Sequence, residues 1–163
     1  MSEGLGGIPE LTTSDICAAL AGANKAGLKL LIGQVCGEGD INAICDTFRP
    51  EVIRLSKRLK WRSDELTMAR IAKLLDIVVY ESLSPNKCPT CRGTKHDITN
   101  PVKSCETCKG TGGFAIPQSA KAEYLGMSGR AWRKTWKDRE DDIRTLLEIR
   151  LHQARVSICN KLY

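Results

Sequence analysis

Apolar residues recur at helical spacing over most of the first eighty residues, and this pattern predicts a helical body. A first helix is expected from about Thr13 to Gln34, ending at the Gly37–Asp40 turn, where glycine and aspartate favour turn conformations. A second helix is expected to begin near Asp40, with Pro50 either inside it or at the start of a separate helix. Ser63, Asp64 and Glu65 predict the start of a further helix that runs to about Leu83.

The second predicted helix is strongly amphipathic. Its apolar stripe contains Ile41, Ile44, Cys45, Phe48, Val52, Leu55 and Leu59. Its polar side contains Arg49, Arg54, Lys57, Arg58 and Lys60. A helix of this kind buries one face against the core and leaves the charged face in water.

The helical pattern is interrupted once. Residues 87 to 113 are rich in Gly, Thr, Lys and Cys and short of large apolar residues, so they cannot build a core of their own. Helical signals return over 118–125, 128–136 and 140–156. The predicted fold is mainly α, with an N-terminal helical region (1–84), an inserted cysteine module (85–116) and a C-terminal helical region (117–163) in one compact unit.

Four cysteines in the inserted module have the spacing of a metal site. Cys88 and Cys91 form one Cys-x-x-Cys pair, and Cys105 and Cys108 form a second. Tetrahedral Zn²⁺ needs four such ligands, so the pattern predicts one structural zinc ion rather than a catalytic one, because four thiolates leave no open position. The alternatives are reduced thiols, a redox pair, or His96 replacing one cysteine, although a lone loop histidine is more often solvated.

The remaining cysteines are expected to be free and buried, since cysteine is among the most buried residue types. They are Cys17, Cys36, Cys45 and Cys159, and they have no mutual ligand spacing. The first ten residues do not resemble a secretory signal, and no apolar run is long enough to span a membrane. A cytoplasmic location is therefore expected, where metal binding is favoured over disulfides.

Positive charge is concentrated in the second half of the chain. Residues 1–86 contain 10 Lys and Arg against 11 Asp and Glu, a net charge of −1, whereas residues 87–163 contain 15 against 8, a net charge of +7. Such an asymmetry predicts a polyanionic partner for the C-terminal half.

Residues 118–136 indicate a helix, a short turn and a second helix, as in a helix-turn-helix motif. Ala122 suits a close crossing, Gly126 a turn, and Leu125 and Trp132 a shared core. The residues expected to face double-stranded DNA are Ser128, Arg130, Arg133, Lys134 and Lys137, with Ser128 also as the N-cap. The alternative interpretations are a solvated basic face, or RNA binding with Trp132 and Trp136 stacked on bases instead of serving as core anchors.

The sequence does not indicate an enzyme. It has two histidines, and no nucleophile-elbow motif or phosphate-binding glycine loop can be identified. An acidic cluster comprises Asp138, Glu140, Asp141 and Asp142. These acids are expected to complement the dipole at the start of a helix rather than to bind a metal.

The second half of the chain resembles the lambdoid phage Q-type late-gene transcription antitermination proteins. The shared elements are Cys88-x-x-Cys91-x-Gly93, Cys105-x-x-Cys108-Lys109-Gly110-x-Gly112, and Pro117-x-Ser119-Ala120 running on through Tyr124 to Trp132. The resemblance covers roughly residues 85–150, and Lys95 stands where the pattern has a second glycine.

This resemblance implies a protein of the bacterial host cytoplasm that binds DNA at a phage late promoter and engages host RNA polymerase with its sigma factor. It would stay with the polymerase and suppress pausing and termination. The N-terminal helices and the zinc module would be candidates for the polymerase contact. A DNA-binding repressor and an RNA-binding zinc module remain alternatives, and the oligomeric state is open. The cysteine module also looks like half of the DnaJ-type zinc domain, but the histidine-proline-aspartate motif of a J-domain is missing.

Overall fold

The protein is mainly helical. The computed structural model describes residues 12, 18–36, 39–83, 88, 90–91, 93–110, 112 and 116–162. Its helices are α2 (Lys25–Cys36), α3 (Ile41–Arg58), α4 (Glu65–Leu83), α5 (Gln118–Tyr124), α6 (Gly129–Ala131), the π-helix η1 (Trp132–Trp136) and α7 (Lys137–Leu162). Within these ranges the structure has no strand, and one isolated bridge pairs His96 with Ser104. None of the described helices is both long and apolar enough to cross a membrane.

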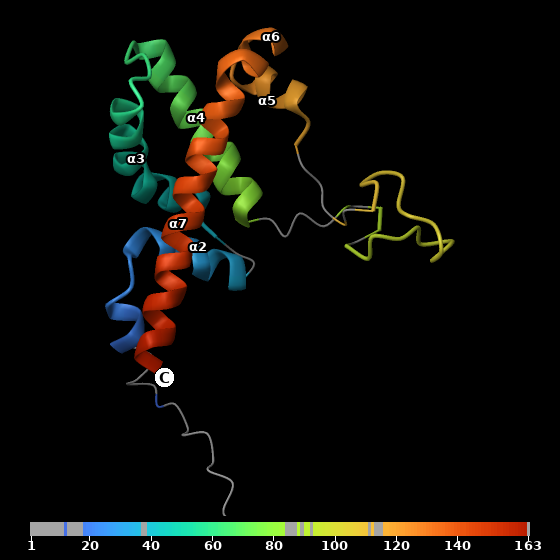
Figure 1. Cartoon of the computed structure of the whole chain (residues 1–163), viewed down its shortest axis with the longest axis horizontal. Helices are drawn as coiled ribbons and strands as arrows, with labels where there is room; N and C mark the ends of the chain where they lie inside the picture. The colour runs from blue at the N-terminus through green and yellow to red at the C-terminus, as the bar shows by residue number, and fades with distance from the viewer. Residues whose placement is uncertain are drawn as a thin grey trace, which may run out of the picture.

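Helix α7 is the longest element, and the other helices of the body pack around it (Figure 1). Close packing of α2 on α7 depends on Gly27, since a Cβ atom at this position would lie 2.0 Å from the backbone oxygen of Arg150. The largest fully buried side chains come from α2, α3, α4, η1 and α7, and they include Leu30, Phe48, Leu74, Trp132, Ile143 and Leu147. One continuous core therefore joins both halves of the chain.

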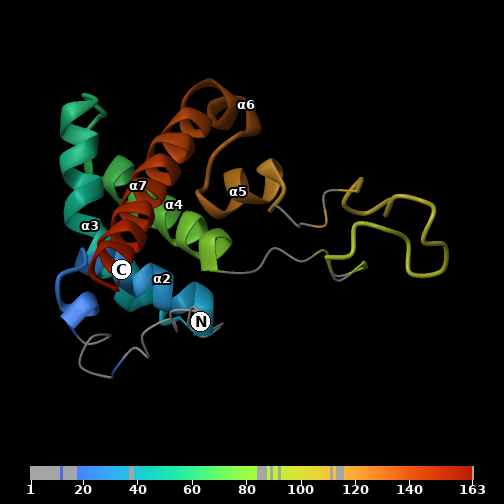
Figure 2. The same ribbon diagram turned by 60° about the horizontal axis from the view of Figure 1, so that its bottom comes forward.

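The cysteine module lies to one side of this body in two different views (Figures 1 and 2). The four buried cysteines form a separate cluster from the core of the helical body. Among the described residues of the module, no helix forms. The module is inserted between α4 and α5, as the sequence predicts.

The first predicted helix is wrong as a single element. Residues 13–17 of that prediction lie outside the described residues, and the chain turns at Gly22 and Ala23 before α2 begins at Lys25. The side chain of Asn24 accepts a hydrogen bond from the N–H of Gly27 at 3.0 Å, so it caps a new helix. The sequence pattern did not indicate this break, because the apolar residues keep helical spacing on both sides of it.

The next two predicted helices are confirmed. Asp40 caps α3 by accepting a hydrogen bond from the N–H of Ala43 at 3.1 Å. Pro50 lies inside α3 and does not begin a separate helix. Asp64 accepts a hydrogen bond from the N–H of Thr67 at 3.0 Å, and the helix that follows ends at Leu83.

The C-terminal helices are joined differently from the prediction. Separate helices were expected over 128–136 and 140–156, whereas α6, η1 and α7 follow one another without a break from Gly129 to Leu162. No glycine or proline stands between Trp136 and Glu140 to end the helix. The N–H of Lys137 donates a hydrogen bond to the carbonyl of Trp132, five residues earlier. The helix therefore widens to a π-helical turn there and does not end.

A buried network of charged side chains connects α4, α5 and α7. Lys121 of α5 lies 2.8 Å from Glu81 of α4 and 2.5 Å from Glu140 of α7. Arg144 contacts the same two carboxylates, at 2.6 and 2.7 Å. Glu140 is therefore a core residue and not a dipole-complementing acid at a helix start, as the sequence suggested. Glu140 does lie in the first turn of α7, as expected, but α6 and η1 continue directly into α7, so this turn is not the free start of a helix.

Glu81 also binds the segment that leads from the cysteine module to α5. The N–H of Ile116 donates a hydrogen bond to its carboxylate at 3.1 Å. Burial alone would raise the pKa of Glu81. Hydrogen bonds from Lys121 and Arg144 outweigh burial and hold the pKa below its ordinary value of 4.5. The carboxylate is thus ionised in the folded protein at neutral pH.

Replacing Lys121 with alanine should be strongly destabilising, because it leaves two buried carboxylates without their main cation. We expect a loss of about 3–5 kcal/mol in the free energy of unfolding, measured by urea denaturation at pH 7. Lys57→Ala, an exposed lysine of α3 without an ion pair to the described residues, should change it by less than about 0.5 kcal/mol. Equal effects of the two substitutions would contradict this role for Lys121.

The Glu81 carboxylate should also give the fold a pH dependence. A lowered folded-state pKa stabilises the protein above the unfolded pKa, and this contribution disappears as the pH falls through the folded-state pKa. The stability difference between the wild type and Glu81→Gln should therefore be largest above pH 4.5 and shrink in acid. Urea titrations over a pH series test this, and a difference that does not depend on pH would contradict it.

Candidate metal centre and nucleic-acid interface

The four predicted ligand cysteines converge on one point. Their sulfur atoms all lie within 4.8 Å of one another, and Cys88, Cys91 and Cys105 are at most 1% exposed. The Sγ atoms of Cys88 and Cys105 are 3.8 Å apart, and those of Cys91 and Cys108 are 3.7 Å apart. A tetrahedron of sulfurs about 2.3 Å from a central ion has edges of about 3.8 Å. The cluster can therefore hold one metal ion such as Zn²⁺.

The two halves of the module have matching backbones. Five residues after the first cysteine of each pair, Gly93 and Gly110 have φ values of 90° and 77°. Seven residues after it, Lys95 and Gly112 have φ values of 72° and 76°. Lys95 thus adopts the left-handed conformation that glycine adopts at the matching position of the second half.

Hydrogen bonds hold the two halves of the module together, and they lower the pKa of Cys108 although the pKa of Cys105 is raised. The hydroxyls of Thr90 and Thr107 lie 2.9 Å apart, and each threonine is two residues after the first cysteine of its pair. Burial raises the pKa of Cys108, but hydrogen bonds from the N–H of Gly112 and from neighbouring thiols lower it to about 6. A thiol with this pKa is mainly thiolate at neutral pH, which is the form that binds metal.

The other histidine and cysteine predictions had mixed outcomes. His96 is exposed, as expected. Cys45 is buried, and burial together with a hydrogen bond to Asp76 raises its pKa to about 12. Cys36 and Cys159 are exposed, which contradicts the prediction for them, because each lies near the end of a helix where the core no longer covers it. Cys17 lies outside the described residues.

A tight turn separates α5 from α6. Gly126 has a φ of 64° there, and the N–H of Met127 donates to the carbonyl of Ala122 at 3.0 Å. Ser128 caps α6 by accepting from the N–H of Ala131 at 3.3 Å. Leu125 and Trp132 are both buried in the core, as predicted. Trp136 is also buried, which confirms that the two tryptophans are core anchors.

Sequence reasoning missed the residue that holds this turn on the body. Arg70 of α4 donates to the carbonyls of Leu125 and Gly126, at 3.1 and 2.8 Å. No motif marks Arg70, because its partners are backbone atoms more than fifty residues away. The turn is therefore fixed from outside as well as by its own glycine.

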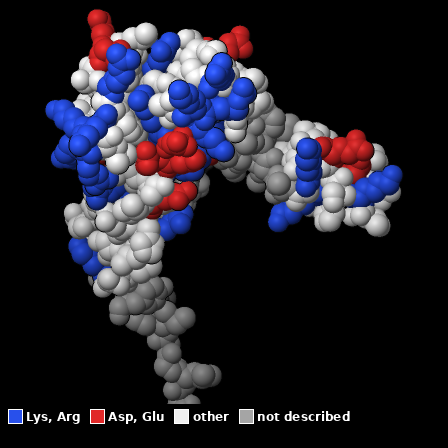
Figure 3. Space-filling model, turned by 45° about the horizontal axis from the view of Figure 1, so that its top comes forward, with Lys and Arg blue, Asp and Glu red and all other residues white. Residues whose placement is uncertain are grey.

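The residues predicted to contact DNA lie together on the exposed side of the segment that follows this turn. Ser128, Arg130, Arg133, Lys134 and Lys137 are all exposed. None of the four cations forms a salt bridge with another described residue. Figure 3 shows Lys and Arg side chains gathered over the start of this long helix. An unpaired group of this kind can interact with phosphates.

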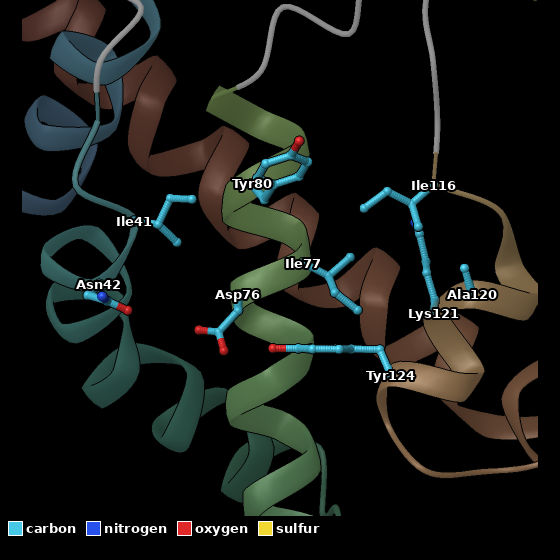
Figure 4. A pocket seen from close by; sticks show the side chains of 9 residues that line it. All are labelled: Ile41, Asn42, Asp76, Ile77, Tyr80, Ile116, Ala120, Lys121 and Tyr124. Carbon is cyan, nitrogen blue, oxygen red and sulfur yellow. The ribbon is translucent and has the colours of Figure 1, made fainter.

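A separate hollow of about 500 Å³ lies between α3, α4 and α5 (Figure 4). Its walls are mainly apolar, and Tyr124 extends across it toward Asp76. Tyr80, on the same wall as Asp76, is half exposed. The residues that line this hollow include no serine, cysteine or histidine.

Comparison with known proteins adds no assignment: no protein-family model matches the chain, and a search of curated proteins found no match. The chemistry of the site therefore rests on the chain's own residues. Those residues provide a four-thiolate metal cluster and a separate group of exposed cations.

Replacing one ligand cysteine should abolish metal binding. We expect the wild type to retain about one zinc ion per chain after dialysis, and Cys105→Ser to retain almost none, because three thiolates hold the ion much less tightly. Elemental analysis of the purified proteins measures this. Cys159→Ser, which removes an exposed thiol outside the cluster, is the control. Full zinc content in Cys105→Ser would refute the assignment of this ligand.

Proposed function

We propose that the protein is a phage late-gene transcription antitermination factor. In this proposal it binds promoter-proximal double-stranded DNA, engages host RNA polymerase with its sigma factor, and suppresses pausing and termination in the host cytoplasm. The observation that carries the DNA-binding part is the group of four exposed, unpaired cations after the α5–α6 turn. The part that concerns polymerase comes from the resemblance of residues 85–150 to the Q-type family.

The α5–α6 pair supports a helix-turn-helix interpretation. α5 is short and buried through Ala122 and Lys121, while the next helical segment begins at an exposed N-cap. In such motifs the N-terminal residues of the second helix meet base edges in the major groove. Ser128 and Arg130 would then lie closest to the bases, and Arg133, Lys134 and Lys137 would grip the backbone.

One structural zinc ion would complete the module between α4 and α5. The four-thiolate cluster leaves no open coordination position, so the ion would act as a staple and not as a catalyst. A module whose described residues form no helix and no large apolar core needs such a staple to keep one conformation. The lowered pKa of Cys108 favours the thiolate that binds the ion, so little free energy is needed to remove its proton.

The tip of the module offers a surface for a protein partner. Between the two cysteine pairs, Val102 is 93% exposed and Ile98 is 65% exposed. Asp97 and Asn100 fix the chain between them, accepting hydrogen bonds from the N–H groups of Thr99 and Val102. Rigidly displayed apolar side chains suit a protein surface better than a nucleic acid. This tip is therefore our candidate for the polymerase contact.

The burial of Trp132 and Trp136 weighs against RNA binding by base stacking, because buried rings cannot stack on bases. A DNA-binding repressor uses the same helix pair and is the main competing function. An antitermination factor acts on polymerase after initiation, whereas a repressor does not.

Transcription in vitro tests the proposal. Purified host polymerase would transcribe a template carrying a phage late promoter and a downstream terminator, with and without the zinc-loaded protein. We expect increased readthrough that depends on the promoter-proximal DNA. Arg133→Ala should weaken DNA binding by about 5- to 100-fold, through the loss of a base or phosphate contact, and should lower readthrough with it.

Lys25→Ala, an exposed lysine at the start of α2, is the matched control and should leave DNA binding unchanged. Specific DNA binding with unchanged readthrough would favour a repressor. Readthrough that Arg133→Ala does not alter would contradict the assigned DNA-binding surface.

A further inference from the structure

A second group of arginines surrounds a hollow between α3 and α7. The hollow has a volume of about 350 Å³ and is lined by Arg54 and Arg58 of α3 and Arg150 of α7. Leu55 and Leu146 form apolar parts of its wall. Three guanidinium groups from two helices therefore border one space, and none of them belongs to the α6–η1 segment.

The three arginines are not neutralised equally. Arg150 is held in place, since its Nε donates to Glu51 at 2.6 Å and its Nη1 to Gln153 at 2.8 Å. Arg54 and Arg58 are exposed and form no salt bridge with another described residue. One arginine is thus pre-positioned while two remain available to a ligand.

Two carboxylates reduce the positive charge in and beside this hollow. Glu51 lines it and is engaged by Arg150, while Asp142 of α7 interacts electrostatically with Arg58. Burial and the neighbouring carboxylates of Asp138 and Asp141 raise the pKa of Asp142, whereas Arg58 lowers it. The hollow itself keeps an excess of positive charge, because only Glu51 among its lining residues is acidic.

A stack of side chains connects the end of α3 with the start of α7. The guanidinium of Arg139 lies 4.5 Å from the ring centre of Trp136 and 5.2 Å from that of Trp61. Trp61 follows directly on the exposed cations at the end of α3, so this stack fixes them beside the start of α7. Leu146 is ten residues beyond Trp136, so the hollow lies about 15 Å from Trp136 along the helix axis.

This spacing is compatible with one duplex reaching both places, because the major groove is about 12 Å wide and its two bordering backbones lie on either side. Figure 3 shows the Lys and Arg side chains in two groups, over α3 and over the start of the long C-terminal helix, with acidic side chains partly between them. Two separate basic contacts are therefore expected rather than one continuous strip.

We propose that the hollow lined by Arg54, Arg58 and Arg150 binds a backbone phosphate of the DNA held by α6 and η1. This inference rests on the proposed DNA-binding function. A phosphodiester oxygen would accept hydrogen bonds from the guanidinium forks, and the apolar wall would reduce competition from water. The contact would be independent of sequence, because the backbone is the same at every base pair.

The salt dependence of DNA binding tests the proposal. Fluorescence anisotropy would measure binding of the zinc-loaded full chain to a labelled duplex of about 30 base pairs of arbitrary sequence, over about 0.05–0.3 M NaCl. Each phosphate contact contributes about 0.9 to the slope of log K against log salt. The double variant Arg54→Ala/Arg58→Ala should lower the slope by about one and weaken binding about fivefold at about 0.15 M salt.

Two controls separate charge from structure. The double variant Arg54→Lys/Arg58→Lys should keep most of the slope, because the positive charges remain. Lys25→Ala, a lysine outside both basic groups, should behave as the wild type. Circular dichroism should show the same helix content in every variant, since Arg54 and Arg58 are exposed.

The possible failures are distinguishable. A wild-type slope in Arg54→Ala/Arg58→Ala, together with a reduced slope in Arg133→Ala, would overturn this inference and leave the proposed function intact. No salt-dependent binding of the wild type would overturn both. If inorganic phosphate raised the melting temperature of the wild type but not of Arg54→Ala/Arg58→Ala, while their DNA slopes were equal, the hollow would take free phosphate and the backbone assignment would be wrong.

Discussion

The arrangement of α4, α5 and α7 depends on the buried ammonium group of Lys121. It lies between Glu81 and Glu140, and these carboxylates also receive Arg144. Through these contacts α4, α5 and α7 share one electrostatic centre, and the chain leaving the cysteine module is tied to it by the N–H of Ile116. Isolated buried charges are costly, so each member of this group requires the others. The metal cluster and the basic helix pair are thus attached to the same point of the body.

Sequence patterns predicted the features that depend on local spacing. The amphipathic stripe and the Asp40 and Asp64 caps located α3 and α4, and the two Cys-x-x-Cys pairs located the metal cluster. Features that depend on long-range pairing were not predicted. Arg70 contacts carbonyls more than fifty residues away. The sequence around Lys121 does not distinguish it from a surface lysine, because its partners Glu81 and Glu140 lie on α4 and α7.

The net charge of each half of the chain also failed to predict where basic side chains gather on the surface. Residues 1–86 carry a net charge of −1, yet Arg54, Lys57, Arg58 and Lys60 are exposed together at the end of α3. Several acids of that half lie elsewhere or are already paired, as Glu81 and Glu51 are. A neutral sum can therefore conceal a local basic surface, because folding sorts charges by helix face and not by position along the chain.

The π-helix between Trp132 and Trp136 lets the helix that carries the basic segment hold one extra residue. A π-helical turn accommodates one more residue than an α-helical turn, and each residue of an α-helix corresponds to a rotation of about 100° around the axis. In a regular α-helix an inserted residue would turn every preceding side chain by that angle, whereas the wider turn absorbs the rotation. Loss of a single residue within this turn would therefore restore a regular α-helix, with Ser128 and Arg130 still facing nearly the same way and α7 still packed on the core.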